Sequence, residues 1–309
     1  MPSSTPPAPA DARSGGRRRA ILIAAKLACS ALLLFWLAHG IDLSETMDRL
    51  QQARPAPIVV ALIVLLAQAL LGAWRWAAIV RMQGGMLDAV AALRLFLIGM
   101  FVNQTLSSTV GGDAMRVWRL RASGLPLGTA LEGILLERLT GLVTLSVLAA
   151  AALPYASGPP ALALWLLTGA GVGVALCAVL ADTLSRRLAG RIADLGRNAR
   201  HALASACALP ILAAALAIHL LGAAAAWLVA VALGIDIALL PCLLLVPPTL
   251  LLATLPISFG GWGVREGGLI ATLALVGVPA ADALAMSVGF GLLVTAAGLP
   301  GGAVWAFSR

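Results

Sequence analysis

The chain has 309 residues, of which 61% are hydrophobic and 11% are charged, and its formal net charge is +8. Soluble domains carry about 25% charged residues, so this composition excludes a soluble globular protein and predicts an all-α polytopic membrane protein. The apolar residues form long unbroken runs, which argues against a transmembrane β-barrel. Because the basic residues flank these runs, a role in membrane topology is favoured over nucleic-acid binding.

The N-terminal part predicts a tail, a first span, a loop and a second span. Residues 1–16 are rich in Pro, Ser, Ala and Gly, which is typical of a disordered tail. Three arginines precede an apolar run at 20–38 that is long enough for an uncleaved first span with a cytoplasmic N-terminus. We expect the polar stretch at 39–56 to form an external loop and the run at 57–80 to return to the cytoplasm.

Near its end, the second predicted span carries Trp74, Arg75 and Trp76. Tryptophan and arginine side chains at the ends of spans can reach the lipid headgroups. We interpret this triplet as an anchor at the membrane interface.

The next apolar run, at 89–110, is interrupted by polar residues and is followed by a basic cluster at 116–121. A full crossing would place the cluster outside the cell, against the positive-inside rule. We therefore predict a re-entrant hairpin that enters from the cytoplasmic side and turns around residues 103–108.

Three further spans are predicted at 129–153, 161–181 and 208–233, with the main cytoplasmic loop at 182–207. The last of these spans contains His219 near its centre. We interpret this histidine as a core residue satisfied by a neighbouring helix, and a proton relay is the alternative.

The last part of the chain predicts a second hairpin and a final span. Residues 237–259 are long enough to cross a membrane but contain Pro241, Pro247 and Pro248. Because a proline inside a helix costs about 3 kcal/mol or more, we expect a broken helix. The following apolar run is too short to span, whereas the run at 282–307 is long enough.

Together these assignments give six full spans and two re-entrant hairpins in one transmembrane domain, residues 17–309. Eight full spans is the alternative. The predicted cytoplasmic segments contain most of the arginines, whereas the predicted external loops contain only Arg49 and Arg54. This asymmetry places both termini in the cytoplasm.

A short pattern occurs twice, each time where an apolar run stops. Residues 105–116 read TLSSTVGGDAMR and residues 254–265 read TLPISFGGWGVR. A glycine pair at the end of a half-helix lets another backbone or a ligand approach closely, although packing of a tight turn is the alternative. The predicted topology opens the first hairpin to the inside and the second to the outside. The two copies would then be inverted repeats, as in many secondary transporters.

Charged residues lie within the predicted membrane elements. Asp113 and Arg116 are three residues apart, so they share a helix face and can pair. Adjacent residues point in different directions, so Glu137-Arg138 and Arg265-Glu266 are expected to need other partners. A charge at the centre of a spanning helix costs roughly 2.5–3.5 kcal/mol, so these groups are expected to face the protein interior. Structural pairing and a polar translocation path are both consistent with this pattern.

The motifs at 103–116 and 254–266 resemble those of the lysylphosphatidylglycerol synthase transmembrane family, a flippase-like membrane domain. The family's first motif, N-x-x-L-P and then GGD-x-x-R, is matched by Asn103, Leu106, Gly111, Gly112, Asp113 and Arg116. An acidic-Arg pair of the next helix is matched by Glu137 and Arg138. The later motif, L-P-I-T-P-G-G-x-G-x-x-E, is matched by Leu255, Pro256, Ser258, Gly260, Gly261, Gly263 and Glu266. Ser107 and Phe259 stand where the family usually has proline.

This resemblance implies a flippase-like bundle, and it covers most of residues 20–307. The family's soluble synthase domain has no counterpart in the sequence, so lipid aminoacylation is not implied. The residues expected to bind substrate are Asn103, Gly111, Gly112, Asp113, Arg116, Glu137, Arg138, Ser258, Gly260, Gly261, Arg265 and Glu266.

The leading hypothesis is a flippase of lipids or lipid-linked glycans in a bacterial inner membrane, in which Arg116, Arg138 and Arg265 attract an anionic or zwitterionic headgroup. The alternative is a non-transporting partner of a lipid or glycan biosynthetic enzyme, bound through the cytoplasmic loop. A third candidate is an integral-membrane transferase. No nucleotide-binding loop, metal-ligand cluster or nucleophile elbow is present in the sequence. We therefore expect no enzymatic activity, cofactor or metal.

Cysteine labelling tests the predicted topology. A single cysteine at position 119, in a background from which the four native cysteines have been removed, is expected to react only with reagents applied to the cytoplasmic side. Labelling of this position from outside would contradict the first re-entrant hairpin.

Overall fold

The computed structural model describes most of the chain. The described residues are 43–105, 109–122, 124–155, 208–253 and 261–307, together with Ser258 and several residues between 24 and 41. Within these ranges the chain is helical and contains no strand. The predicted tail 1–16, most of the predicted first span, the predicted span 161–181 and the predicted loop 182–207 lie outside them.

Four described helices are long and apolar enough to cross a membrane. They are α3 (Pro55–Met82), α6 (Leu127–Ala151), α9 (Ala208–Ala232) and α12 (Ala280–Phe307). Each coincides with one of the six predicted spans, so four of those predictions are confirmed as apolar helices of spanning length.

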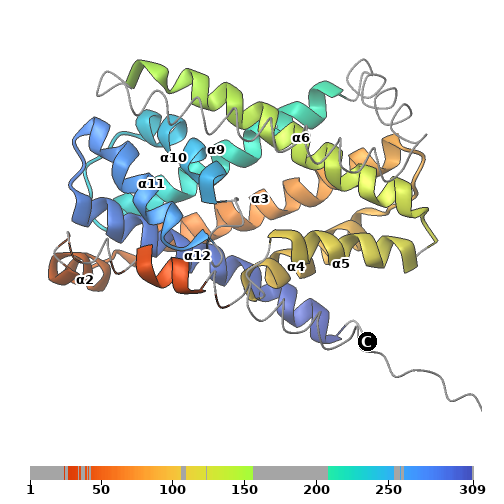
Figure 1. The fold of residues 1–309 in the computed structure, drawn as a ribbon, viewed down its shortest axis with the longest axis horizontal. Coiled ribbons are helices and arrows are strands. Elements are labelled where there is room, and N and C mark those ends of the chain that lie inside the picture. Colours follow the sequence, from red (N-terminus) through yellow and green to blue (C-terminus); the bar gives the residue numbers. More distant parts are fainter. Residues whose placement is uncertain are drawn as a thin grey trace, which may run out of the picture.

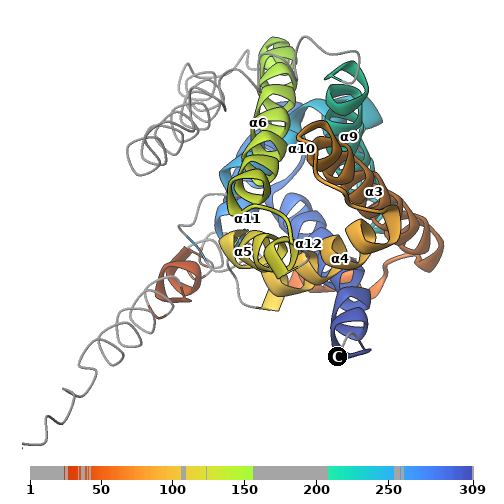
Figure 2. The same ribbon diagram turned by 90° about the vertical axis from the view of Figure 1, so that its right-hand side faces the viewer.

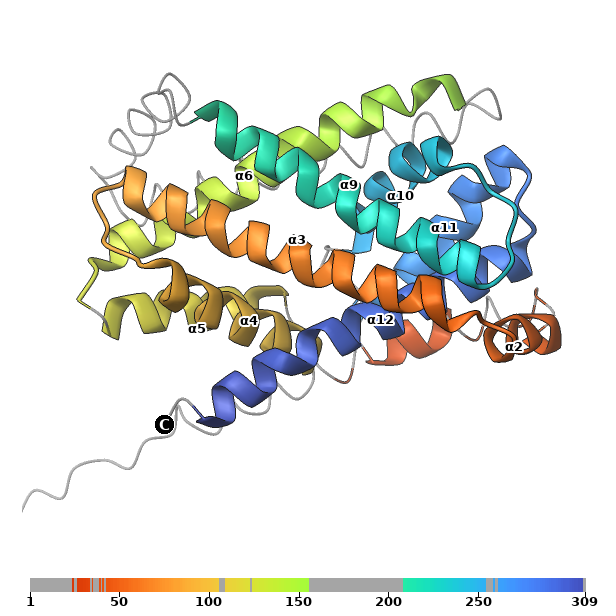
Figure 3. The same cartoon turned by 180° about the vertical axis from the view of Figure 1, so that it is seen from behind.

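The helices α3 and α9 lie side by side and run in opposite directions (Figures 1 and 3). At one end, the backbone N–H of Arg54 donates to the carbonyl of Ala232 at 2.8 Å. Further along, Gln68 Nε2 donates to the carbonyl of Ile218 at 2.8 Å. Small buried residues such as Ala61 and Ala223 let the two helices approach closely, which is how helices associate in lipid.

Each of these two helices leads into a helical hairpin. After α3, α4 (Ala89–Thr105) packs on α5 (Thr109–Ala122), and after α9, α10 (Leu239–Ala253) packs on α11 (Val264–Leu273). Since α3 and α9 are antiparallel, the hairpins start from opposite ends of the pair (Figure 3). With 17 and 15 residues, α4 and α10 are shorter than the roughly 30 Å hydrocarbon core requires. Both predicted hairpins are therefore present as helical hairpins, and their depth in a membrane stays a prediction.

The break in the second hairpin does not lie at the prolines, so this prediction is wrong. The helix α10 continues through Pro247 and Pro248 and ends at Ala253, directly before the repeated pattern. Burial offsets the lost backbone hydrogen bonds, because Cys242, Leu245 and Val246 are fully buried against neighbouring helices. In the first hairpin, Asn103 likewise belongs to helix α4 rather than to the predicted turn.

The polar stretch predicted as an external loop contains a short helix, α2 (Leu43–Gln51). Its Arg49 Nε lies 3.0 Å from Asp282 Oδ1, and Thr46 Oγ1 donates to the carbonyl of Ala281 at 3.4 Å. These contacts hold α2 against the beginning of α12.

The C-terminal half of α12 crosses α4 (Figures 1 and 2). The rings of Phe101 and Trp305 are in contact, with centroids 6.2 Å apart. A Cβ at Gly301 would overlap the carbonyl of Leu97. Glycine is therefore required at this crossing for steric reasons.

Substitution of this glycine is expected to lower the melting temperature of the purified protein in detergent. Gly301→Ala places a methyl group against backbone, which cannot move aside as a flexible side chain can, and such overpacking costs typically 1–3 kcal/mol, an order-of-magnitude figure. Gly267→Ala is the matched control in α11, because a Cβ there meets nothing within 4 Å. Equal melting temperatures for the two variants would contradict the described crossing.

Candidate functional site

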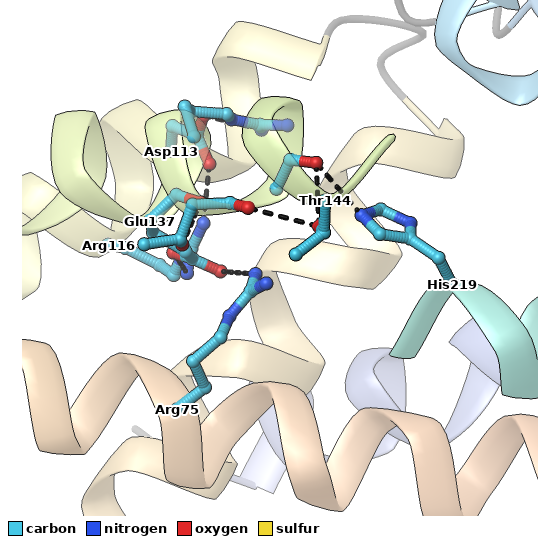
Figure 4. Close-up of polar contacts among 9 residues, drawn as sticks. Arg75, Asp113, Arg116, Glu137, Thr144 and His219 are labelled. Carbon is cyan, nitrogen blue, oxygen red and sulfur yellow. Dashed lines mark hydrogen bonds and ion pairs between the residues drawn. The ribbon is translucent and has the colours of Figure 1, made fainter. Parts of the chain in front are cut away.

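Five charged side chains from three helices form a continuous chain of ion pairs near the first copy of the repeated pattern (Figure 4). Arg138 contacts Asp113 at 2.6 Å, and Asp113 contacts Arg116 at 2.6 Å. Arg116 contacts Glu137 at 2.7 Å, and Glu137 contacts Arg75 at 3.3 Å. Each carboxylate thus lies between two arginines, and the chain begins and ends with an arginine.

This ion-pair chain leads from the protein surface into its interior. The side chain of Arg138 is 42% exposed, whereas those of Arg116, Glu137 and Arg75 are 7%, 8% and 9% exposed. Removing one partner of a buried ion pair leaves an uncompensated charge and is strongly destabilising. The inner members therefore depend on one another for their charge balance.

The helix geometry explains how the chain is assembled. Asp113 and Arg116 lie one turn apart on α5, and their pairing confirms the prediction from their spacing. Glu137 and Arg138 are adjacent on α6 and point in different directions, as predicted. Glu137 reaches Arg116 and Arg75, while Arg138 reaches Asp113 through both Nε and Nη2, at 3.0 and 2.6 Å.

The inner end of the ion-pair chain corrects the interpretation of the tryptophan-arginine triplet. Trp74 is exposed, but Arg75 and Trp76 are buried, so Arg75 faces the protein rather than the headgroups. The guanidinium of Arg116 lies 4.8 Å from the centroid of the Trp76 ring. Arg75 is thus a site residue that the sequence reasoning missed. One signal in the sequence could have identified it, because Glu137 is expected to need a cationic partner other than the adjacent Arg138.

In the first copy of the pattern, glycine permits a close approach of two helices. The backbone N–H of Gly112 donates to Asn103 Oδ1 at 2.9 Å, and a Cβ at position 112 would overlap the carbonyl of Gly99. Gly111 and Gly112 both lie inside α5. This close contact joins α4 to α5 and so positions Asp113 and Arg116.

The glycines of the second copy have a different role. Gly261, the second glycine of the pair, and Gly263 both precede α11 and have left-handed φ angles of 81° and 89°, which favour glycine. The aligned glycines of the two copies are therefore not structurally equivalent. Of the other predicted residues in this copy, Ser258 has a buried hydroxyl without a partner among the described atoms, and Gly260 lies outside the described residues.

Arg265 and Glu266 pair with each other, so the prediction that these adjacent residues need other partners is wrong. Arg265 Nη2 lies 2.6 Å from Glu266 Oε1, and Arg265 Nε donates to the same oxygen at 3.0 Å. They can pair because they lie in the first turn of α11, where the side chain of Glu266 turns back toward the helix start. There Glu266 Oε2 accepts a hydrogen bond from the backbone N–H of Gly263 at 2.5 Å, as in a capping box. Ser287 Oγ of α12 also donates to Glu266 Oε1, at 3.1 Å. These residues form a second cluster, centred on Glu266.

His219 of α9 is held by α6, as the sequence interpretation predicted. Its Nε2 lies 3.1 Å from the carbonyl of Gly141, and Thr144 Oγ1 donates to the same carbonyl at 2.9 Å (Figure 4). A carbonyl only accepts hydrogen bonds, so Nε2 carries the proton. Within the described part of the chain, no group of three potential metal-ligating side chains is found.

Comparison with known proteins identifies the family to which the chain belongs. The family model for the lysylphosphatidylglycerol synthase TM region matches residues 23–301, which include both hairpins and both charge clusters. The chain belongs to this family. No curated protein matches the chain. Family membership and the four apolar helices establish a membrane protein, and the family suggests a lipid-related transport role.

Loss of the carboxylate shared by Arg75 and Arg116 is expected to destabilise the protein. Glu137→Gln leaves both guanidinium groups buried without this anion, and breaking a buried ion pair costs about 3–5 kcal/mol. Arg138→Gln is the comparison, because loss of a partly exposed pair costs about 1 kcal/mol or less. Thermal unfolding in detergent should show a much larger decrease for Glu137→Gln. Similar decreases for both variants would contradict the central place of Glu137.

Proposed function

We propose that the protein is a flippase of lipids or lipid-linked glycans in a bacterial inner membrane. The observation that supports this most is the ion-pair chain, which runs from the partly exposed Arg138 to the buried Arg75. Charged groups inside membrane helices are expensive and mark polar pathways by default. Three arginines and two carboxylates give this chain a net positive charge, which suits a headgroup that carries an anion.

The arrangement of the hairpins favours an inverted repeat. The first unit comprises α3, the α4–α5 hairpin and α6, and the second comprises α9, the α10–α11 hairpin and α12. Corresponding helices α3 and α9 are antiparallel, and the hairpins start from opposite ends. In secondary transporters, such units enclose a substrate site near the midplane and open it to each side in turn.

Within this mechanism, the arginines bind the headgroup and the carboxylates orient them. An anionic group that approaches Arg138 competes with Asp113, and further inward it competes with Glu137 for Arg116 and Arg75. Bidentate contacts between arginine and carboxylate or phosphate have matching geometry, so one anion can replace another. In the second unit, Arg265 and Glu266 hold the start of α11.

We place both termini in the cytoplasm, with the first hairpin open to the cytoplasm and the second to the outside. Membrane lipids are the proposed partners. No catalytic role is assigned to any residue.

The alternative function is that of a non-transporting partner of a lipid or glycan biosynthetic enzyme. The arginine-rich sequence at 182–207, predicted to be a cytoplasmic loop, favours it. Charge reversal of Arg186, Arg187 and Arg191 separates the two functions. If this change abolishes function in cells while Arg116→Ala and Arg265→Ala do not, the partner function is supported.

Reconstitution tests the flippase directly. Purified protein in liposomes with fluorescent-headgroup lipids of several classes is expected to expose inner-leaflet lipid to a quencher faster than empty vesicles do. Arg138→Gln should reduce the rate about tenfold, the effect of one charged hydrogen bond, with little change in melting temperature. Arg94→Gln is the matched control, because Arg94 is an exposed arginine on α4. No exchange above empty vesicles for any lipid class would contradict the proposal.

A further inference from the structure

We infer that Arg75 and Trp76 of α3 form a buried oxyanion-binding site against α6, at the inner end of the ion-pair chain. The site takes a phosphate-type group. It deepens the proposed function, on which it rests for the identity of the molecule that carries this group.

Arg75 has hydrogen-bonding capacity that its neighbours do not use. Its side chain is 9% exposed, and the ion pair that it makes among the described residues, from Nη2 to Glu137 at 3.3 Å, is the longest of the ion-pair chain. Its Nε and Nη1 are buried and have no partner in the described part of the molecule. A buried donor without an acceptor costs about 1–3 kcal/mol, and more when it is charged, so these N–H groups favour an additional acceptor.

The next residue presents another buried donor to the same helix. Trp76 is fully buried, and its Nε1 has no partner among the described atoms. This nitrogen lies 4.0 Å from the position that a Cβ of Gly133 would occupy. Gly133 and Glu137 are one turn apart on α6, so the free donors of Trp76 and Arg75 lie along one face of that helix.

The chemistry of these groups selects the ligand. All three free atoms of Arg75 and Trp76 are N–H donors, and one of the two side chains is a cation. A phosphate oxygen accepts several hydrogen bonds at once and matches the planar guanidinium in a bidentate contact. A cation would be repelled by Arg75. The carboxylate beside it, that of Glu137, is already shared by Arg75 and Arg116, and the buried amide of Gln83, next to Gly133, offers both a donor and an acceptor without a partner. The three N–H donors and the cation therefore favour an oxyanion.

Among its described residues, the second unit has no buried arginine or tryptophan N–H without a partner, so the inferred site belongs to the first unit. Glu266 accepts hydrogen bonds from Arg265, Ser287 and the backbone of Gly263. Trp227 on α9 donates its Nε1 to the carbonyl of Ile237 at 3.0 Å. Trp227 is thus a tryptophan whose N–H is already satisfied, and it offers a matched control for Trp76.

Ligand binding by the purified full-length protein tests the site. The probes are dioctanoyl phosphatidylglycerol, inorganic phosphate and dioctanoylglycerol, which lacks a phosphate, each titrated at constant ionic strength in a neutral detergent. The lipid phosphate is expected to raise the melting temperature of the wild type by mass action. Trp76→Phe, which keeps the ring and removes the N–H, should weaken binding about 2- to 10-fold, the effect of one neutral hydrogen bond. Arg75→Gln should weaken it about tenfold or more.

Trp227→Phe and Arg94→Gln should bind the probes as the wild type does. If Arg75→Gln does not fold, the comparison of Trp76→Phe with Trp227→Phe decides alone. Competition by inorganic phosphate would support a site for the phosphate group itself, and binding of the phospholipid alone would support a lipid headgroup site. Unchanged binding in Trp76→Phe, or equal binding of dioctanoylglycerol, would overturn the inference.

The outcome separates the site from the flippase function. Weakened binding in Trp76→Phe together with no lipid exchange by the wild type would keep the site and reject transport. Lipid exchange by the wild type together with unchanged binding in Trp76→Phe would keep transport and reject the site.

Discussion

The carboxylate of Glu137 is the group on which the rest of the site depends. It lies between Arg116 on α5 and Arg75 on α3, at 2.7 and 3.3 Å, and so joins three helices in an apolar bundle. Each of these side chains is more than nine-tenths buried, so solvation by water cannot compensate its charge. Arg116 in turn pairs with Asp113, and Asp113 pairs with Arg138, so both of these side chains are connected to Glu137 through Arg116.

The hairpins supply the frame for this charge network. Close contact at Gly112 holds α5 against α4, and the turn at Gly261 and Gly263 sets the direction of α11. Antiparallel packing of α3 and α9 places the two hairpins at opposite ends. A fold of this kind holds Arg75, Arg116 and Glu137 in the protein interior, which satisfies the main constraint on ionisable groups in a membrane. Among the described residues, the first cluster leaves two N–H atoms of Arg75 without a partner, whereas Glu266 in the second accepts hydrogen bonds from three groups.

Much of the fold could be predicted from the sequence, because spans and hairpins follow from the length of the apolar runs and from the position of the charges, whereas the prolines predicted a break that α10 does not have. The spacing of Asp113 and Arg116 predicted their pairing, and the family motifs identified the residues around them. The position of Arg75 near the end of a span predicts a place at the interface, but its side chain is buried against Glu137. The direction of a charged side chain depends on where the tertiary structure places a group of opposite charge, and the local sequence does not contain this information. The pairing of Arg265 with Glu266 was missed for a similar reason, since it depends on how α11 begins at Gly263.

If the net positive ion-pair chain carries an anionic headgroup, the rate of lipid exchange must depend on the charge of the headgroup. Rates for fluorescent phosphatidylglycerol and for a fluorescent glycolipid without phosphate can be measured in the same proteoliposomes. We expect the anionic lipid to exchange faster, and added salt to reduce this difference in rate because it screens the exposed Arg138. Equal rates for both lipids at every salt concentration would contradict the claim.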